Sequence, residues 1–178
     1  MVRVPYVDPE SLTEEYRYLF DDNVLGERNI FLALANNPPV LQSFMRFGNT
    51  LWQQSGIERS EMEIVILSVA RAMDAKYEWH QHVPMATEAG LSQSEIRSIA
   101  RGDPDDLSNK KSILVRYASA VATGTVEEDI ADAMTDEFDP DTVVATTLLA
   151  GYYVATARTI DALQIDIEGE FVGWYPDE

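Results

Sequence analysis

The chain has 178 residues, of which 46% are hydrophobic and 25% are charged. This composition is typical of a globular protein with a sizeable core and excludes global disorder. Thirty-one acidic residues against thirteen basic ones give a formal net charge of −18, which repels nucleic acid and anionic lipid. We therefore expect neither a nucleic-acid partner nor a membrane partner.

Helical signals dominate along the whole chain. We predict helices over nine ranges: 11–20, 27–35, 38–54, 60–73, 75–89, 92–101, 109–123, 127–137 and 141–165. No segment alternates convincingly with a period of two, so we expect no sheet and an all-α fold. The clearest loop, at 102–106, is too short for an interdomain linker, so we expect one domain over 1–178.

Turn and cap residues support several of these helix ends. A serine followed three positions later by glutamate predicts a capping box at Ser11, Ser60 and Ser92. Asp74 is a further candidate N-cap, and Gly90 lies where the helix over 75–89 should stop.

Three apolar features bear on location and assembly. The run 142–157 is interrupted by Gly151 and predicts a buried helix that falls short of a membrane span. With no apolar stretch of signal-peptide length at the N-terminus, we expect a cytoplasmic protein. The stripe formed by Phe44, Phe47, Leu51 and Trp52 indicates core or a subunit interface, and the aromatic tail over 168–178 should dock on a surface.

Both histidines of the chain lie within residues 77–82. Glu78 and His82 are four residues apart, so they share one helix face and can hydrogen-bond. A carboxylate on one imidazole nitrogen fixes the tautomer and leaves the other nitrogen for proton transfer. His80 points elsewhere. Glu63, on the preceding helix, could complete the site across an antiparallel turn.

Structural alternatives stand beside this hypothesis. The four-residue spacing of Glu78 and His82 is also that of an ordinary surface ion pair on a helix. Glu63 is also the third residue of the predicted Ser60 capping box. Pro84 favours a functional interpretation, because it leaves the carbonyl of His80 without its helical donor and should bend the helix. The apolar residues around the pair point the same way, since a buried ion pair is costly.

The segment from Ser60 to Gly90 resembles the carboxymuconolactone decarboxylase family, also called alkylhydroperoxidase D-like. The residues that carry the resemblance are Glu63, the run Ile64-Val65-Ile66-Leu67, the motif Tyr77-Glu78-Trp79, His82, Ala86 and Gly90. The similarity extends from 29–41 to the helix that contains Tyr152 and Tyr153. The resemblance implies an all-α fold with a central antiparallel helix pair and assembly into a homo-oligomer, such as a trimer or hexamer.

The family contains two chemistries. One branch reduces peroxides through a Cys-x-x-Cys pair, whose positions would fall on Ala75 and Glu78. The chain has no cysteine, which excludes that thiol mechanism, disulfides and cysteine-ligated zinc. The other branch decarboxylates a carboxylated muconolactone and keeps the Tyr-Glu-Trp…His pattern found here.

The resemblance therefore implies a lyase that acts on a small carboxylated lactone or a related organic acid. We expect His82 to donate the proton, with Glu78, Glu63 and Tyr77 as the other catalytic residues. No cofactor or metal is expected, because a His-x-His pair diverges on a helix. Two alternatives stay open: a relative that binds a small ligand without turnover, and an antioxidant relative that works by another route.

The charge of the chain predicts that its thermal stability depends on salt concentration. Only three of the thirteen basic residues are lysine, and acid-rich, lysine-poor surfaces occur in halophilic proteins. Self-repulsion should weaken as the Debye length falls from about 10 Å at 0.1 M salt to about 3 Å at 1 M. The melting temperature should therefore climb substantially from low to multimolar KCl. A flat or falling curve would remove the halophilic interpretation.

Overall fold

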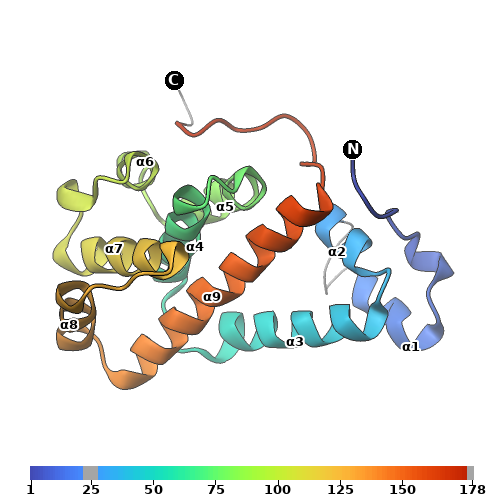
Figure 1. Ribbon diagram of the computed structural model, residues 1–178, viewed down its shortest axis with the longest axis horizontal. Coiled ribbons are helices and arrows are strands. Elements are labelled where there is room, and N and C mark those ends of the chain that lie inside the picture. The colour runs from blue at the N-terminus through green and yellow to red at the C-terminus, as the bar shows by residue number, and fades with distance from the viewer. Residues whose placement is uncertain (22–27, 176–178) are drawn as a thin grey trace. The chain divides into compact units, whose positions relative to one another are not determined.

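The computed structural model describes residues 1–21 and 28–175 (Figure 1). The described residues form helices, turns and loops without a strand, which confirms the all-α prediction. They divide into two compact units. The first unit contains the described residues of 1–54 together with 159–170, and the second contains those of 55–158 together with 171–178. The single domain over 1–178 stays a prediction.

The first unit is built from short helices and one long helix. Its elements are η1 (Pro9–Ser11), α1 (Glu14–Arg17), η2 (Tyr18–Phe20), α2 (Asn29–Leu34) and α3 (Pro38–Gln54). The single helix predicted over 11–20 is therefore wrong. Ser11 ends η1 and Thr13 is the N-cap of α1, so the capping box predicted at Ser11 does not form. Residue 27, the first of the helix predicted over 27–35, lies outside the described residues.

Leucine side chains form the centre of the first unit. Leu12, Leu19 and Leu41 are buried together with Ala35. In the aromatic stripe of α3, Leu51 is buried and Phe47 is 43% exposed, so Leu51 belongs to the core, and a role of Phe47 in a subunit interface stays a prediction.

The second unit contains the segment that resembles a known family. Its elements are α4 (Arg59–Ala72), α5 (Lys76–Glu88), α6 (Gln93–Arg101), η3 (Pro104–Asp106), α7 (Asn109–Thr123), α8 (Glu128–Glu137) and α9 (Pro140–Leu163), the last of which continues into the first unit. The predicted boundaries of its α-helices agree with these to within one or two residues.

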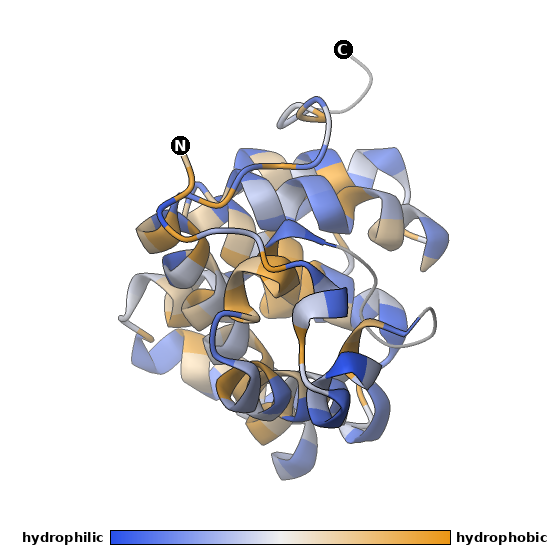
Figure 2. Ribbon diagram, turned by 90° about the vertical axis from the view of Figure 1, so that its right-hand side faces the viewer, coloured by the Kyte–Doolittle hydropathy of each residue, from blue (hydrophilic) through white to orange (hydrophobic). Residues whose placement is uncertain are grey.

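Helix α4 is the core of the second unit. Every residue from Met62 to Ala70 is buried, and α4 packs against α5, α6 and α7. Figure 2 shows hydrophobic and hydrophilic residues interleaved along the other helical ribbons, as expected for helices with one apolar face. Burial on all sides explains why the sequence of α4 reads as a nearly continuous apolar run.

The cap predictions in this unit have mixed outcomes. The capping box at Ser92 is confirmed. At Ser60 it is wrong, because α4 begins one residue earlier, at Arg59, with Glu58 as its N-cap. Asp74 is not an N-cap either, since Ala75 precedes α5 and Asp74 adopts a left-handed φ of 53° in the turn. Gly90, with φ of 95°, follows the end of α5 as predicted.

Helix α9 has 24 residues and contains Gly151, in agreement with the helix predicted over 141–165. Among the described residues it is the one helix long and apolar enough to cross a membrane by length and composition, which corrects the expectation that it falls short. Core helices of soluble proteins meet the same criterion, and half of its apolar window is buried.

The aromatic tail docks as predicted, on α5 within the second unit; its last three residues, 176–178, lie outside the described part. The indole N–H of Trp79 donates to the carbonyl oxygen of Gly173 at 2.9 Å. The Trp174 ring lies 5.4 Å from the Trp79 ring, and the guanidinium of Arg71 lies 4.8 Å from the Trp174 ring centre. The side chain of His80 accepts a hydrogen bond from the backbone N–H of Val172 at 3.3 Å, so it contacts the tail.

This docking predicts unequal effects for two neighbouring aromatic residues. Trp174→Ala removes the ring contacts with Trp79 and Arg71 and should cost about 1–3 kcal/mol of unfolding free energy. Tyr175→Ala, at a side chain that is 37% exposed, should change it by no more than about 0.5 kcal/mol. Urea denaturation of both full-length variants measures the difference. Equal midpoints would show that the tail does not stabilise the unit.

Candidate active site

Helices α4 and α5 form an antiparallel hairpin that joins Glu63 to His82. The Nδ1 atom of His82 lies 2.8 Å from Oε2 of Glu63. Glu63 is 0% exposed and His82 is 6% exposed, so the pair is shielded from water. The predicted hydrogen bond between Glu78 and His82 is wrong, because the carboxylate that orients the imidazole comes from the facing helix.

Glu63 also contacts Arg59, one helical turn earlier on α4. The Nε atom of Arg59 lies 3.3 Å from Oε1 of Glu63 without the alignment of a hydrogen bond, so this contact is an ion pair. With the Ser60 capping box absent, the capping role considered for Glu63 disappears. Its carboxylate is instead held between a guanidinium and an imidazole.

Glu78 has a very different environment. Its side chain is buried, and neither of its carboxyl oxygens hydrogen-bonds to a residue that the structure describes. Desolvation by burial raises the pKa of Glu78 from 4.5 to about 7. Near neutral pH this carboxyl group therefore exchanges a proton easily, which is the property of a general acid.

Three tyrosines surround this region. The Tyr153 ring, on α9, meets the His82 ring edge-on at 5.1 Å, and the Tyr152 ring lies 5.5 Å from that of Tyr153. Burial raises the pKa of Tyr152 above its ordinary value, which keeps its hydroxyl neutral. Tyr77 is buried on α5 about 100° around the helix from Glu78. A catalytic role for Tyr77 stays a prediction.

Two contributors were missed by sequence reasoning. Arg59 had a detectable signal, since it precedes Glu63 by the four residues that allow an ion pair on a helix. Tyr153 had none, because more than seventy positions of sequence separate it from His82. Arg71, on α4, donates to the carbonyl oxygen of Ala100 at 2.6 Å and packs against the Trp174 ring.

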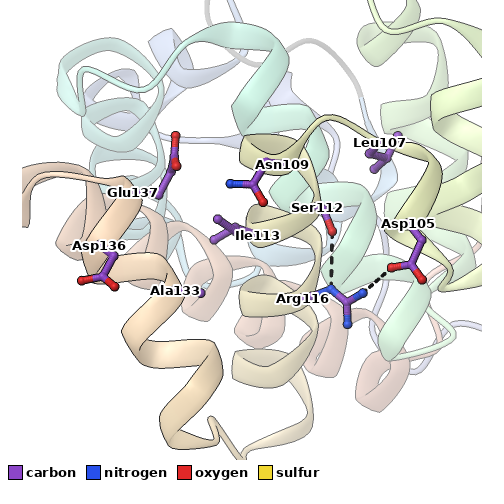
Figure 3. A pocket seen from close by; sticks show the side chains of 9 residues that line it. All are labelled: Asp105, Leu107, Asn109, Ser112, Ile113, Arg116, Ala133, Asp136 and Glu137. Atoms are coloured by element: carbon purple, nitrogen blue, oxygen red, sulfur yellow. Dashed lines mark hydrogen bonds and ion pairs between the residues drawn. The ribbon is translucent and has the colours of Figure 1, made fainter.

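A concave surface lies between α7 and α8, away from the hairpin residues (Figure 3). This groove has a volume of about 720 Å³ and is lined by charged residues that include Asp105, Arg116, Asp136 and Glu137. Arg116 is already paired with Asp105 at 2.5 Å. None of the predicted site residues lines the groove, and the described residues contain no cluster of three potential metal ligands. We therefore place the candidate active site at the α4–α5 hairpin.

The raised pKa of Glu78 predicts a pH-dependent gain of stability in Glu78→Gln. Because the folded-state pKa of about 7 exceeds the ordinary 4.5, burial destabilises the fold as pH rises through this window and most strongly above it. At pH 8 the variant should be more stable than the parent by up to about 3 kcal/mol. At pH 4.5 that gain should vanish.

Chemical denaturation at both pH values measures this difference. Glu88→Gln, at an exposed position on the same helix, is the matched control and should show no such pH dependence. A difference between Glu78→Gln and the parent that is the same at pH 4.5 and pH 8 would contradict a raised pKa.

Three solved structures share the fold. One is the alkylhydroperoxidase AhpD core of a peroxidase-related protein from Ralstonia eutropha JMP134. It superposes with a TM-score of 0.83 at 16% sequence identity, and the match covers 98% of this chain and 96% of the other chain. A peroxidase-related protein from Silicibacter sp. TM1040 gives 0.79 at 16% identity, covering 96% of this chain and 92% of its own. A protein from Agrobacterium tumefaciens, proposed to be an antioxidant defence protein AhpD, superposes with a TM-score of 0.71 at 18% sequence identity. The match covers 77% of this chain and 96% of the other chain.

No curated protein matches the sequence. A family model does: residues 38–106, from the start of α3 to the end of η3, match the carboxymuconolactone decarboxylase family. This match contains Arg59, Glu63, Glu78 and His82 and confirms the resemblance found in the sequence. Residues 38–106 of this cysteine-free chain are thus similar to the carboxymuconolactone decarboxylase family, and the chain has an AhpD-like fold.

Proposed function

We propose that the chain is a lyase that decarboxylates a small carboxylated lactone or a related organic acid. The observation that carries this proposal is the buried carboxyl group of Glu78, which has a pKa of about 7 and lies one helical turn from a histidine held by Glu63. The similarity of residues 38–106 to the carboxymuconolactone decarboxylase family supports the same reaction class.

The reaction requires one proton. The bond between the substrate's carboxylate and its ring carbon breaks, CO₂ leaves, and the electron pair of that bond remains on the carbon, delocalised toward the lactone carbonyl. Protonation of this carbon completes the conversion of R–CO₂⁻ and H⁺ into R–H and CO₂. A neutral carboxylic acid at the reacting carbon supplies that proton without repelling the substrate as strongly as a carboxylate would.

We assign the donation of the proton to Glu78, and we assign to His82 the return of a proton to Glu78 after each turnover. Nδ1 of a neutral His82 ring donates to Glu63, which leaves the lone pair on Nε2 and fixes the ring orientation. Glu78 and His82 share one face of α5, with about 5–6 Å between their Cβ atoms, so a proton can pass between them through a bridging water molecule. Tyr153 holds the other side of the imidazole by its edge-on contact.

The names of the structural neighbours point to another reaction, peroxide reduction. The thiol route to that reaction begins with a thiolate, which this sequence cannot form. An antioxidant reaction by another route and binding of a small acid without turnover are the two alternatives, and release of CO₂ separates the proposed lyase from both.

The proposal predicts that His82→Gln and Glu78→Gln lose turnover while staying folded. Purified chain in high salt should release CO₂ from one or more carboxylated γ-lactones, and the rate should fall as pH rises past about 7, because the protonated form of Glu78 disappears. Each variant should lower kcat by about 100- to 10,000-fold. The measurement is CO₂ release across pH 5–9.

His80→Gln is the matched control, because it makes the same replacement two positions away, at a side chain that contacts the tail. It should keep the parent's rate and pH profile. Equal loss in His80→Gln and His82→Gln would remove the assignment of His82. Binding of the lactones with no CO₂ release would favour the non-catalytic alternative.

A further inference from the structure

A cavity of about 130 Å³ lies beside helix α6 in the second unit. Its lining includes Ser94, Arg97, Ser98 and Arg101, and it includes none of the residues assigned to the candidate active site. At about 30 Å³ per water molecule, this volume has room for one small ion or about four waters. The cavity is therefore a separate place at which a small ligand can bind.

The four lining residues of α6 lie on one face of the helix. They follow one another at intervals of three, one and three residues, which is the spacing of neighbours over two helical turns. Asp106 and Leu107 add to the lining from η3 and the residue after it. Because α6 packs against η3, the fold of the second unit by itself forms the cavity.

Arg97 and Arg101 bring two positive charges to this cavity. Neither side chain makes a hydrogen bond or an ion pair with a residue that the structure describes, although the chain has 31 acidic residues. Arg71 and Arg116, by contrast, make structural contacts. Two like charges four residues apart on a helix repel each other. The helix dipole favours a cation in the last turn of α6, at Arg101, but not at Arg97 in its middle.

Ser98 gives a second and independent indication of a ligand. This residue is 6% exposed, and its hydroxyl group has no hydrogen-bond partner among the described residues. Buried hydroxyl groups are normally hydrogen-bonded, because an unpaired one costs free energy. Since Ser98 lines the cavity, an oxygen atom of a ligand in the cavity can accept its hydrogen bond.

We propose that this cavity binds the phosphate group of a small molecule, held by Arg97, Arg101 and Ser98. Two guanidinium groups match the two negative charges of a phosphate group, and their planar forks donate to its oxygens in pairs. The hydroxyl group of Ser98 adds a further donor. A carboxylate, with one charge and two oxygens, satisfies fewer of these donors.

Two acidic residues also line the cavity, and they differ in what offsets their charge. Glu95 forms an ion pair with Lys111 and accepts the backbone N–H of Ser92 at the start of α6. Asp106 is exposed, and its side chain has no hydrogen-bond or ion-pair partner among the described residues. Asp106 therefore opposes the binding of an anion, and removal of its charge should strengthen that binding.

The test titrates the isotope-labelled full chain with inorganic phosphate or with acetate at constant ionic strength, and the amide NMR signals of α6 report binding. Phosphate should shift these signals saturably and bind about 10-fold or more tightly than acetate. Arg97→Gln and Arg101→Gln should each weaken phosphate binding by about 10- to 100-fold, and Ser98→Ala by about 2- to 10-fold. Asp106→Asn should strengthen it by about 2- to 5-fold.

Two control variants remove the same charges at exposed positions away from the cavity, Arg158→Gln on α9 and Asp129→Asn on α8. Both should leave the affinity for phosphate unchanged. Arg97→Gln should keep the parent's melting temperature, and Arg97→Lys, which keeps the charge and loses the fork, should bind with intermediate affinity.

Three results would overturn the proposal: no saturable shift in the parent, equal affinity for phosphate and acetate, or equal weakening in Arg97→Gln and Arg158→Gln. An unchanged affinity in Asp106→Asn would also contradict it. The outcome is independent of the proposed lyase, because none of these measurements requires release of CO₂.

Discussion

The buried carboxylate of Glu63 is the constraint on which the site depends. A charge with 0% exposure is strongly destabilising unless partners surround it, and removal of one partner from such a pair typically costs about 3–5 kcal/mol. Its partners come from two helices, Arg59 on α4 and His82 on α5. A shift of α5 by one residue would move His82 by 1.5 Å along the axis and rotate it by about 100°. The pair thus fixes the register of the hairpin.

Two carboxyl groups on the hairpin have very different surroundings. Glu63 is offset by a guanidinium and an imidazole, whereas burial without a hydrogen-bond partner among the described residues raises the pKa of Glu78 to about 7. Acid–base enzymes commonly separate the roles of two carboxyl groups in this way. The contrast lies in the environment and not in the residue type, since both residues are glutamate.

Helix α5 contributes side chains both to the candidate site and to the docking of the tail. Glu78 and His82 belong to the candidate site, while Trp79 and His80 hold the C-terminal segment through Gly173 and Val172. The tail therefore stabilises the site helix from outside the site. The acidic surface adds a further condition, because a net charge of −18 repels an anionic substrate at low ionic strength and does so less in concentrated salt.

The helices of the second unit and the resemblance of residues 38–106 to a family could be predicted from the sequence, because hydrophobic periodicity and a spaced motif are local properties. Cap signals were less reliable, since Ser60 lies inside α4, which begins at Arg59. Which carboxylate orients His82 depends on the packing of α4 against α5. Glu78 satisfies the spacing rule on α5, but Glu63 approaches Nδ1 from the facing helix, and Tyr153 approaches from α9. Such contacts depend on how helices pack, which spacing along one helix does not encode.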